Sequence, residues 1–165
     1  MATLLKAVRR YAENHADATG IAQTPIPGLA MVRATEPSDL LHAVYRPLVC
    51  LVVQGSKLVT VGTQRFAFSA GDSLLVTADV PTVSQITRAS IAAPYLSLVL
   101  ELDLAVIAQL TVEMGAERIA DTAPVRVDPT DSEVADAALR LIRLLDRPAS
   151  VPVLQAQFVR ELHYW

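Results

Sequence analysis

The chain has 165 residues, of which 52% are hydrophobic, and its formal net charge is -3 at pH 7. This length and apolar content suit one globular domain with a sizeable core. The 14 basic residues are outnumbered by 17 acidic ones, which argues against direct binding to a phosphate backbone, because proteins that bind one usually carry a basic surplus. The single cysteine, Cys50, excludes an intrachain disulfide. Since no stretch reads as a signal peptide or a membrane span, we expect a soluble cytoplasmic protein.

The first segment, residues 3–17, predicts an amphipathic surface helix. Its apolar positions recur at helical spacing on one face, and they are Leu4, Leu5, Val8, Tyr11 and Ala12. Pro25 and Pro27 then interrupt regular structure. Residues 29–35 and 40–45 read as two strands joined by a short polar turn.

The central part of the chain, residues 45–102, predicts an antiparallel all-β unit. Short runs rich in β-branched and aromatic residues alternate with turns, at 48–53, 57–61, 65–68, 73–77, 83–88 and 95–102. Gly55, Gly62 and Gly71 stand where short hairpins need a positive φ. About eight strands this closely spaced bury their apolar faces by forming a sandwich or a small barrel. In the last run, Leu96 and Leu98 share a core face, while Tyr95 and Ser97 share a mixed one.

The remaining residues predict mainly helices. Asp103 caps a first helix that Gly115 ends, and residues 123–128 are extended. The sequence Thr130-Asp131-Ser132-Glu133 has the form of a capping box, which starts a second helix over about residues 132–146. Pro148 ends that helix and a third begins near Pro152, so the two form an αα-hairpin.

Three stretches of the central part carry a resemblance to a known family. These stretches are YRPLVCLVVQGSKLVTVG, SAGDSLLVTADVP and APYLSLVLELD. They are similar to the N-terminal sensory domain of AraC-type bacterial transcriptional regulators, and the similarity runs from about residue 24 to the C-terminus. The resemblance implies a cupin-like antiparallel β-barrel, or double-stranded β-helix, flanked by helices and followed by a helical dimerisation element. It also implies a helix-turn-helix DNA-binding domain, which this chain lacks, so we expect DNA contact only through that domain.

These expectations give one regulatory domain over residues 1–165. Residues 1–23 are an N-terminal helix and lead-in, 24–102 the barrel, and 103–165 the dimerisation region. The second helix has a wide apolar stripe, formed by Val134, Ala138, Leu141 and Leu145. Either both flanks of this helix pack on the barrel and the next helix, or one flank forms a homodimer interface. We favour the dimer, because wide apolar stripes on a terminal hairpin often mark a partner surface.

The residues do not indicate catalysis. Enzymatic cupins bind a metal through histidines and a carboxylate, but residues 45–102 contain no histidine, and His15, His42 and His163 lack ligand spacing. Cys50 in its apolar strand reads as a buried, inert thiol. We therefore expect no metal, no cofactor and no enzyme activity. A stand-alone cupin isomerase or dioxygenase is the alternative, and the missing histidines weigh against it.

A binding site inside the barrel is the remaining expectation. Its polar candidates are Arg33, His42, Tyr45, Gln54, Gln85 and Tyr95, and its apolar lining is Val53, Val59, Phe66, Phe68 and Val76. Taken singly, each polar residue reads as facing water or bonded to backbone; of the set, we expect at least two to face the lumen. Such a pocket suits a small, largely apolar or aromatic effector, with Arg33 able to neutralise a monocarboxylate. The effector would alter how a dimer presents its DNA-binding domains.

Overall fold

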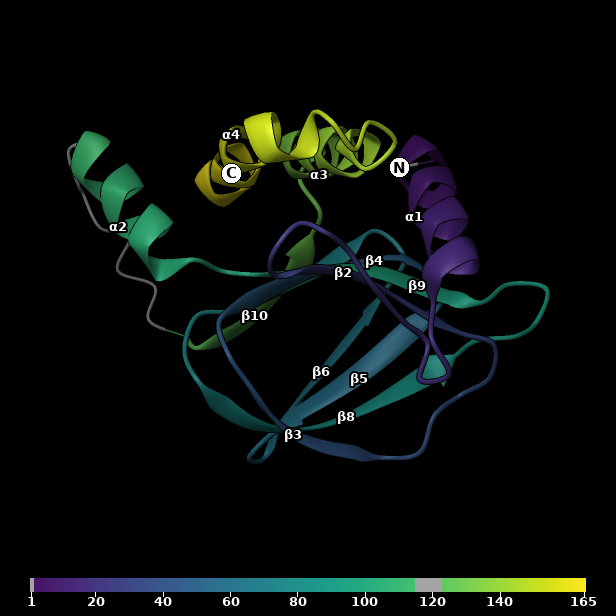
Figure 1. The fold of residues 1–165 in the computed structure, drawn as a ribbon. Helices are drawn as coiled ribbons and strands as arrows, with labels where there is room; N and C mark the ends of the chain where they lie inside the picture. Colours follow the sequence, from purple (N-terminus) through teal and green to yellow (C-terminus); the bar gives the residue numbers. More distant parts are fainter. Residues whose placement is uncertain (1, 115–122) are drawn as a thin grey trace.

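Ten strands form two antiparallel sheets in a computed structural model, which describes residues 2–114 and 123–165. The six-stranded sheet has the order β1 (Ile21–Gln23), β2 (Leu29–Ala34), β9 (Tyr95–Glu101), β4 (Leu48–Gln54), β7 (Asp72–Val76) and β10 (Val125–Pro129). The four-stranded sheet has the order β3 (Leu41–Tyr45), β8 (Val80–Arg88), β5 (Ser56–Val61) and β6 (Gln64–Ser69). The two sheets face each other and make the predicted cupin-like barrel (Figure 1).

The predicted glycine turns direct the chain between the sheets. Gly55, with φ 83°, leads from β4 in one sheet to β5 in the other, and Gly71, with φ 94°, leads back from β6 to β7. The two turns are tied together, because Ala70 N–H donates to Gly55 O at 3.1 Å. Gly62, with φ 60°, closes the β5–β6 hairpin within one sheet. The positive φ predicted at all three glycines is confirmed. The predicted hairpin is confirmed at Gly62 only, because Gly55 and Gly71 connect strands of different sheets.

Four helices complete the fold, and three of them cover one face of a sheet. α1 (Ala2–His15), α3 (Ser132–Leu144) and α4 (Val151–Tyr164) lie over the six-stranded sheet, on the side away from the four-stranded sheet (Figure 1). α2 (Leu104–Glu113) stands apart from that layer, at the left of Figure 1. Its start is tied to α4, since the Asp103 N–H donates to His163 Nε2 at 2.8 Å.

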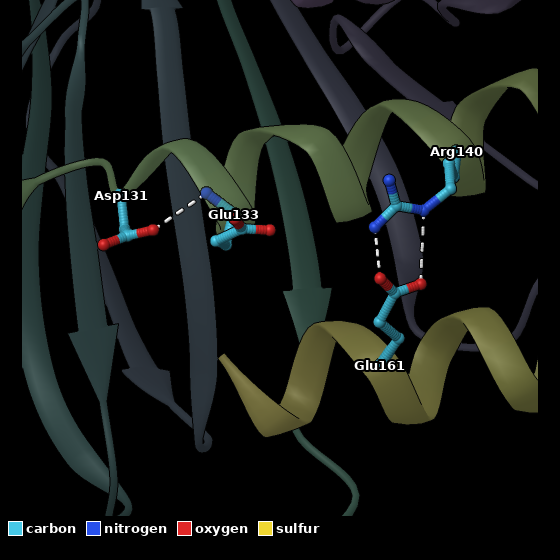
Figure 2. Close-up of polar contacts among 4 residues, drawn as sticks. All are labelled: Asp131, Glu133, Arg140 and Glu161. Atoms are coloured by element: carbon cyan, nitrogen blue, oxygen red, sulfur yellow. Dashed lines mark hydrogen bonds and ion pairs between the residues drawn. The ribbon is translucent and has the colours of Figure 1, made fainter.

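Two helix starts carry side-chain caps. Asp103 caps α2 as predicted, and its carboxylate accepts from Ala105 N–H at 2.9 Å. For α3, the capping-box prediction put Thr130 at the cap, but Asp131 occupies it and accepts from Glu133 N–H at 2.8 Å (Figure 2). Thr130 instead bonds the Ser73 hydroxyl of β7, because its side chain is used to anchor the strand that precedes the helix. Gly115, the predicted end of α2, lies outside the described residues.

The α3–α4 pair forms the predicted αα-hairpin. Arg140 of α3 binds the Glu161 carboxylate with two donors, one of which, Nε, lies 3.2 Å from Oε2 (Figure 2). Both side chains are partly exposed. The bidentate geometry fixes the two helices side by side at this point.

The apolar residues form two separate cores, one on each face of the six-stranded sheet. The helix-side core joins α1, α3 and α4 to that sheet, and its fully buried members include Leu4, Val8, Met31, Leu51, Leu98 and Leu141. The barrel interior lies between the sheets, and its buried members are Cys50, Val52, Val59, Phe68, Leu74, Val76, Val80, Ile86, Tyr95 and Val125. Both faces of the six-stranded sheet are therefore covered.

The predicted strands are present, with two additions at the ends of the barrel. β1 pairs with β2, and β10 pairs with β7, so strands before residue 24 and after residue 102 belong to the barrel. β1 has three residues, too few for a periodic pattern to be recognised in the sequence. The extended segment predicted at residues 123–128 corresponds to β10.

Candidate functional site in the barrel interior

Strand alternation decides which side chains enter the barrel. In β9, Leu96 and Leu98 join the helix-side core, whereas Tyr95 joins the barrel interior. In β4, a bulge shifts the register between Val52 and Gln54. The bulge moves Gln54 to the helix side, where it pairs with Leu96. Val53 alternates in phase with Leu51, so it packs in the helix-side core and not in the lumen, where the sequence analysis placed it. The other predicted lining residues, Val59, Phe66, Phe68 and Val76, do contact the barrel interior.

Tyr95 is the largest polar side chain of this interior. It has no exposed surface, its hydroxyl lies 4.0 Å from Cys50 Sγ, and it hydrogen-bonds with the side chain of Ser97. Burial, followed by the neighbouring Cys50, raises the pKa of Tyr95 well above its usual value. The phenol therefore keeps its proton at neutral pH and can both donate and accept a hydrogen bond.

Lys57 brings a positive charge into the same space. On β5 it is paired with Phe68 on one side and Ile86 on the other, and both partners are buried in the barrel interior. Its Nζ lies 5.7 Å from the centre of the Tyr45 ring, within the range of a cation–π contact. Burial lowers the pKa of Lys57, whereas the nearby Cys50 and Tyr45 raise it, and the net pKa is raised. The side chain is therefore an ammonium ion at neutral pH.

Two of the six predicted polar residues, Tyr45 and Tyr95, face the barrel interior. This agrees with the expectation that at least two of the set would do so. Tyr45 lies opposite Val80 in the β3–β8 ladder, and Tyr95 lies opposite Ala34 in the β2–β9 ladder. Lys57 and Cys50 connect them, so the structure brings both phenols to one polar group.

Arg33 and His42 lie on the other faces of their strands. Arg33 is paired with Leu96, a member of the helix-side core, and lines a hollow beside α1 that also contains Glu13 and Asp17. It therefore does not supply the interior cation that the sequence analysis assigned to it. His42 is exposed, and its partner in β8 is Val83, which alternates with the buried Thr82 and Ser84.

The two glutamines have structural partners outside the lumen. Gln54 accepts from Arg9 of α1 at 2.9 Å and donates to Pro94 O at 2.8 Å, which ties α1 to the loop before β9. Gln85 donates to Ser38 O at 3.1 Å. Both were predicted as lumen residues; the bulge in β4 and the register of β8 turn them away from it.

Sequence reasoning missed Lys57, Thr82 and Ser84. The signal available in the sequence was the alternation of side chains between the two faces of a strand. By this alternation Lys57 lies on the same face of β5 as Val59, and Thr82 and Ser84 lie on the same face of β8 as Val80 and Ile86. Thr82 is 3% and Ser84 4% exposed. A lysine in a short strand usually faces water, which is why the phase alone did not single it out.

The β3 strand is exposed on its inward face as well as its outward face. Leu41 and Ala43 lie opposite Ser84 and Thr82 in the ladder, so they share the inward face of the four-stranded sheet. Leu41 is nevertheless 57% exposed, and Ala43 is exposed as well. The inward face of this edge strand is therefore in contact with solvent at Leu41 and Ala43.

The side chains of Lys57, Tyr45, Tyr95 and Cys50 suit the binding of a small molecule. Within residues 2–114 and 123–165, no three histidine, cysteine or acidic side chains are close enough to hold a metal ion. The contact of Cys50 with Tyr95 is long and supplies no general base. What the group offers is one cation, two phenols and an apolar wall, which is the usual composition of a small-molecule site.

The helical stripe predicted as a dimer interface is largely covered by the chain itself. Ala138 and Leu141 have no exposed surface and belong to the helix-side core, while Val134 and Leu145 pack against that core and stay partly exposed. α1 covers one flank of α3 and α4 the other, which is the packing alternative that the sequence also allowed. Ala138 and Leu141 are therefore unavailable to a partner in this fold.

No helix in the described part of the chain combines the length and apolar character needed to cross a membrane.

Solved structures with a similar fold include two of ToxT from Vibrio cholerae. An apo variant has a TM-score of 0.58 at 6% identity, with 86% of this chain and 55% of that chain covered. Wild-type ToxT with bound unsaturated fatty acid has a TM-score of 0.53 at 8% identity, with 79% and 51% covered. The AraC-like transcriptional activator CuxR has a TM-score of 0.52 at 13% identity, with 87% and 52% covered. The chain thus spans about half the length of these proteins.

Among curated proteins, none matches the chain by sequence. The family described as AraC-type transcriptional regulator N-terminus does match, over residues 25–165. That range includes nine of the ten strands and three of the four helices of the described structure. The chain therefore belongs to the AraC-type transcriptional regulator N-terminus family.

Proposed function

We propose that this chain is an effector-sensing domain, which binds a small organic molecule in its barrel and thereby controls DNA binding by a separate domain of the same regulator. The observation that supports this proposal most directly is the cluster of Lys57, Tyr45 and Tyr95 inside a largely apolar barrel, whose edge strand β3 is exposed to solvent on its inward face. Family membership supports the regulatory role. The structure of ToxT with bound unsaturated fatty acid supports a small-molecule effector for this fold.

In this proposal the domain is cytoplasmic and has no catalytic role. A cupin enzyme would need a metal held by imidazole and carboxylate ligands. His15 stacks on Tyr11 at the end of α1, and His163 is engaged by Asp103 at the end of α4, so neither reaches the barrel. Elemental analysis checks this part, and about one iron, manganese or zinc per chain would favour the enzyme instead.

We also propose that the regulator acts as a homodimer through its helical layer. Because Ala138 and Leu141 are buried in the chain, the contact surface must come from exposed side chains, such as Val153, which is 73% exposed on α4. Light scattering of the unmodified chain tests the assembly. The mass of a monomer at high concentration would refute the dimer, and Val153→Glu should weaken it without unfolding the chain.

Ligand binding is tested by a thermal-shift screen with sugars, phosphates and aromatic acids. A compound that binds only the folded state at about 100 times its Kd adds roughly 2.7 kcal/mol to the unfolding free energy, which raises the melting temperature by several degrees. We expect hits among apolar organic compounds.

The chain by itself should not bind DNA in a sequence-specific, salt-sensitive manner. Such binding would contradict the proposal that a separate domain contacts DNA.

A further inference from the structure

The Lys57 ammonium is an unusual occupant of the barrel interior. Its strand partners Phe68 and Ile86 are 2% and 8% exposed, and it interacts with Tyr45 and Cys50. Within the described residues, no carboxylate makes an ion pair with it. A buried ammonium is usually paired with an anion, because its removal from water is costly. The interior therefore holds a cation that has no carboxylate partner among the described residues.

We propose that Lys57 is the anchor for the carboxylate of an apolar monocarboxylic acid, and this inference rests on the proposed function of the barrel as an effector site. One ammonium matches one carboxylate, whereas a phosphate or dicarboxylate would leave a negative charge without a partner. The apolar body of the acid would lie against the Val59, Phe68 and Val80 side chains, which line the same interior.

The neighbours of Lys57 favour an acid over a sugar. The Lys57 ammonium lies 5.7 Å from the centre of the Tyr45 ring and also hydrogen-bonds with the Tyr45 side chain. Because an ammonium has three N–H donors, it keeps donors for an incoming oxygen. Tyr95 and Ser97 already bond each other, and Thr82 donates to Ala43 O at 3.3 Å. Few donors and acceptors are thus left for the several hydroxyls of a sugar, and unmade hydrogen bonds in a buried site are expensive.

The first experiment compares acids with their neutral amides in the thermal-shift assay. The probes are decanoate with decanamide and 3-phenylpropionate with 3-phenylpropanamide, tested on the unmodified chain, Lys57→Met, Lys57→Arg and Lys6→Met. Lys6 is exposed on α1 and is the other lysine of the chain, which makes it the matched control. We expect at least one acid to stabilise the unmodified chain and Lys6→Met, with affinity reduced roughly tenfold or more in Lys57→Met. Lys57→Arg should keep part of the binding.

The second experiment uses the unmodified chain, so it does not depend on how a variant folds. Acetylation of the two lysines is followed by mass spectrometry with and without the stabilising acid. The acid should slow the acetylation of Lys57 several-fold and leave that of Lys6 unchanged.

The outcomes separate this inference from the function on which it rests. If amides stabilise the chain as well as acids do, or if Lys57→Met binds the acids unchanged, the anchor role is refuted while the effector site stands. Acid binding that leaves Lys57 acetylation unchanged refutes it as well. If neither acids nor amides nor any compound of the broader screen stabilises the chain, both the anchor and the effector site are refuted.

Discussion

On one face of the six-stranded sheet, apolar side chains from three helices and four strands interlock, and on the other face the barrel interior mixes apolar with polar groups. All three buried polar residues of the described chain, Thr82, Ser84 and Ser97, lie on the barrel side, as does Lys57. Buried polar groups reduce stability unless they are fully bonded. The comparison indicates that the helix-side core supplies most of the stability and that the barrel interior retains polar atoms for binding.

Substitution of Leu141 should have the largest effect, because this side chain is fully buried between α3 and its neighbours. Leu141→Ala is expected to lower the unfolding free energy by about 3 to 5 kcal/mol, the range for a large buried side chain that leaves a cavity. Urea unfolding measures it. Val134→Ala, on the same helix but partly exposed, should cost about 1 kcal/mol. If Leu141→Ala lowered the unfolding free energy by less than about 1 kcal/mol, Leu141 would lie on a surface. That result would contradict the comparison between the helix-side core and the barrel interior.

At the end of the barrel, Gly55→Ala should cost about 2 to 3 kcal/mol. Gly55 has φ 83°, and an added Cβ would lie 2.5 Å from Arg88 O and 3.0 Å from Tyr95 Cα. Backbone strain and the clash therefore add together. Gly62→Ala is the control, since φ is 60° there and a Cβ would meet nothing within 4 Å, so about 1 kcal/mol is expected. Equal losses in urea unfolding would show that the approach of Arg88 to the turn is not a tight one.

In the barrel interior, Lys57→Met should lower the unfolding free energy by about 1 kcal/mol in the absence of ligand. Burial disfavours the ammonium, but the neighbouring Cys50 and the contact with Tyr45, worth about 0.5 to 2 kcal/mol, favour it, and the net pKa of Lys57 is raised. The matched control Lys6→Met should change stability by less than about 0.5 kcal/mol. A stabilised Lys57→Met protein in urea unfolding would mean that the desolvation of the ammonium outweighs these contacts.

The smallest effect is expected at the rim of the helical layer, where Arg140 and Glu161 join α3 to α4 (Figure 2). Their side chains are 40% and 33% exposed, so water weakens the pair. A double-mutant cycle with Arg140→Met and Glu161→Gln should give a coupling free energy of about 0.5 kcal/mol. The coupling should fall in 1 M NaCl, where charges are screened over a few ångströms. Salt-independent coupling would indicate a buried contact.

The sequence predicted the fold because local signals and strand alternation agree with it. Gly55, Gly62 and Gly71 indicated the turns, and Leu4, Val8 and Ala12 indicated the buried face of α1. Prediction failed where the signal is not local. The bulge after Val52 turns the Gln54 side chain away from the barrel interior, and a bulge that depends on pairing with another strand leaves no mark in the strand itself. Val53 was assigned to the wrong face, since it alternates in phase with Leu51 of the helix-side core.

The candidate site was predicted less well than the fold. Tyr45 and Tyr95 were identified as polar residues in apolar strands, but Arg33 was assigned as the interior cation and Lys57 was not among the candidates. The choice depends on the face of each strand, and a shift of one residue exchanges the faces. The stripe on α3 illustrates a second limit, because an apolar surface such as Leu141 does not reveal in the sequence whether its own chain or another covers it.

β9 contributes side chains to both cores. Tyr95 and Ser97 face the barrel interior, while the intervening Leu96 and Leu98 press against the helices. Close-packed interiors transmit displacements because they contain little free volume. β9 then continues through Leu102 into Asp103, whose N–H is held by His163 of α4. We therefore expect a molecule that contacts Tyr95 to act on the same strand that packs against the helical layer.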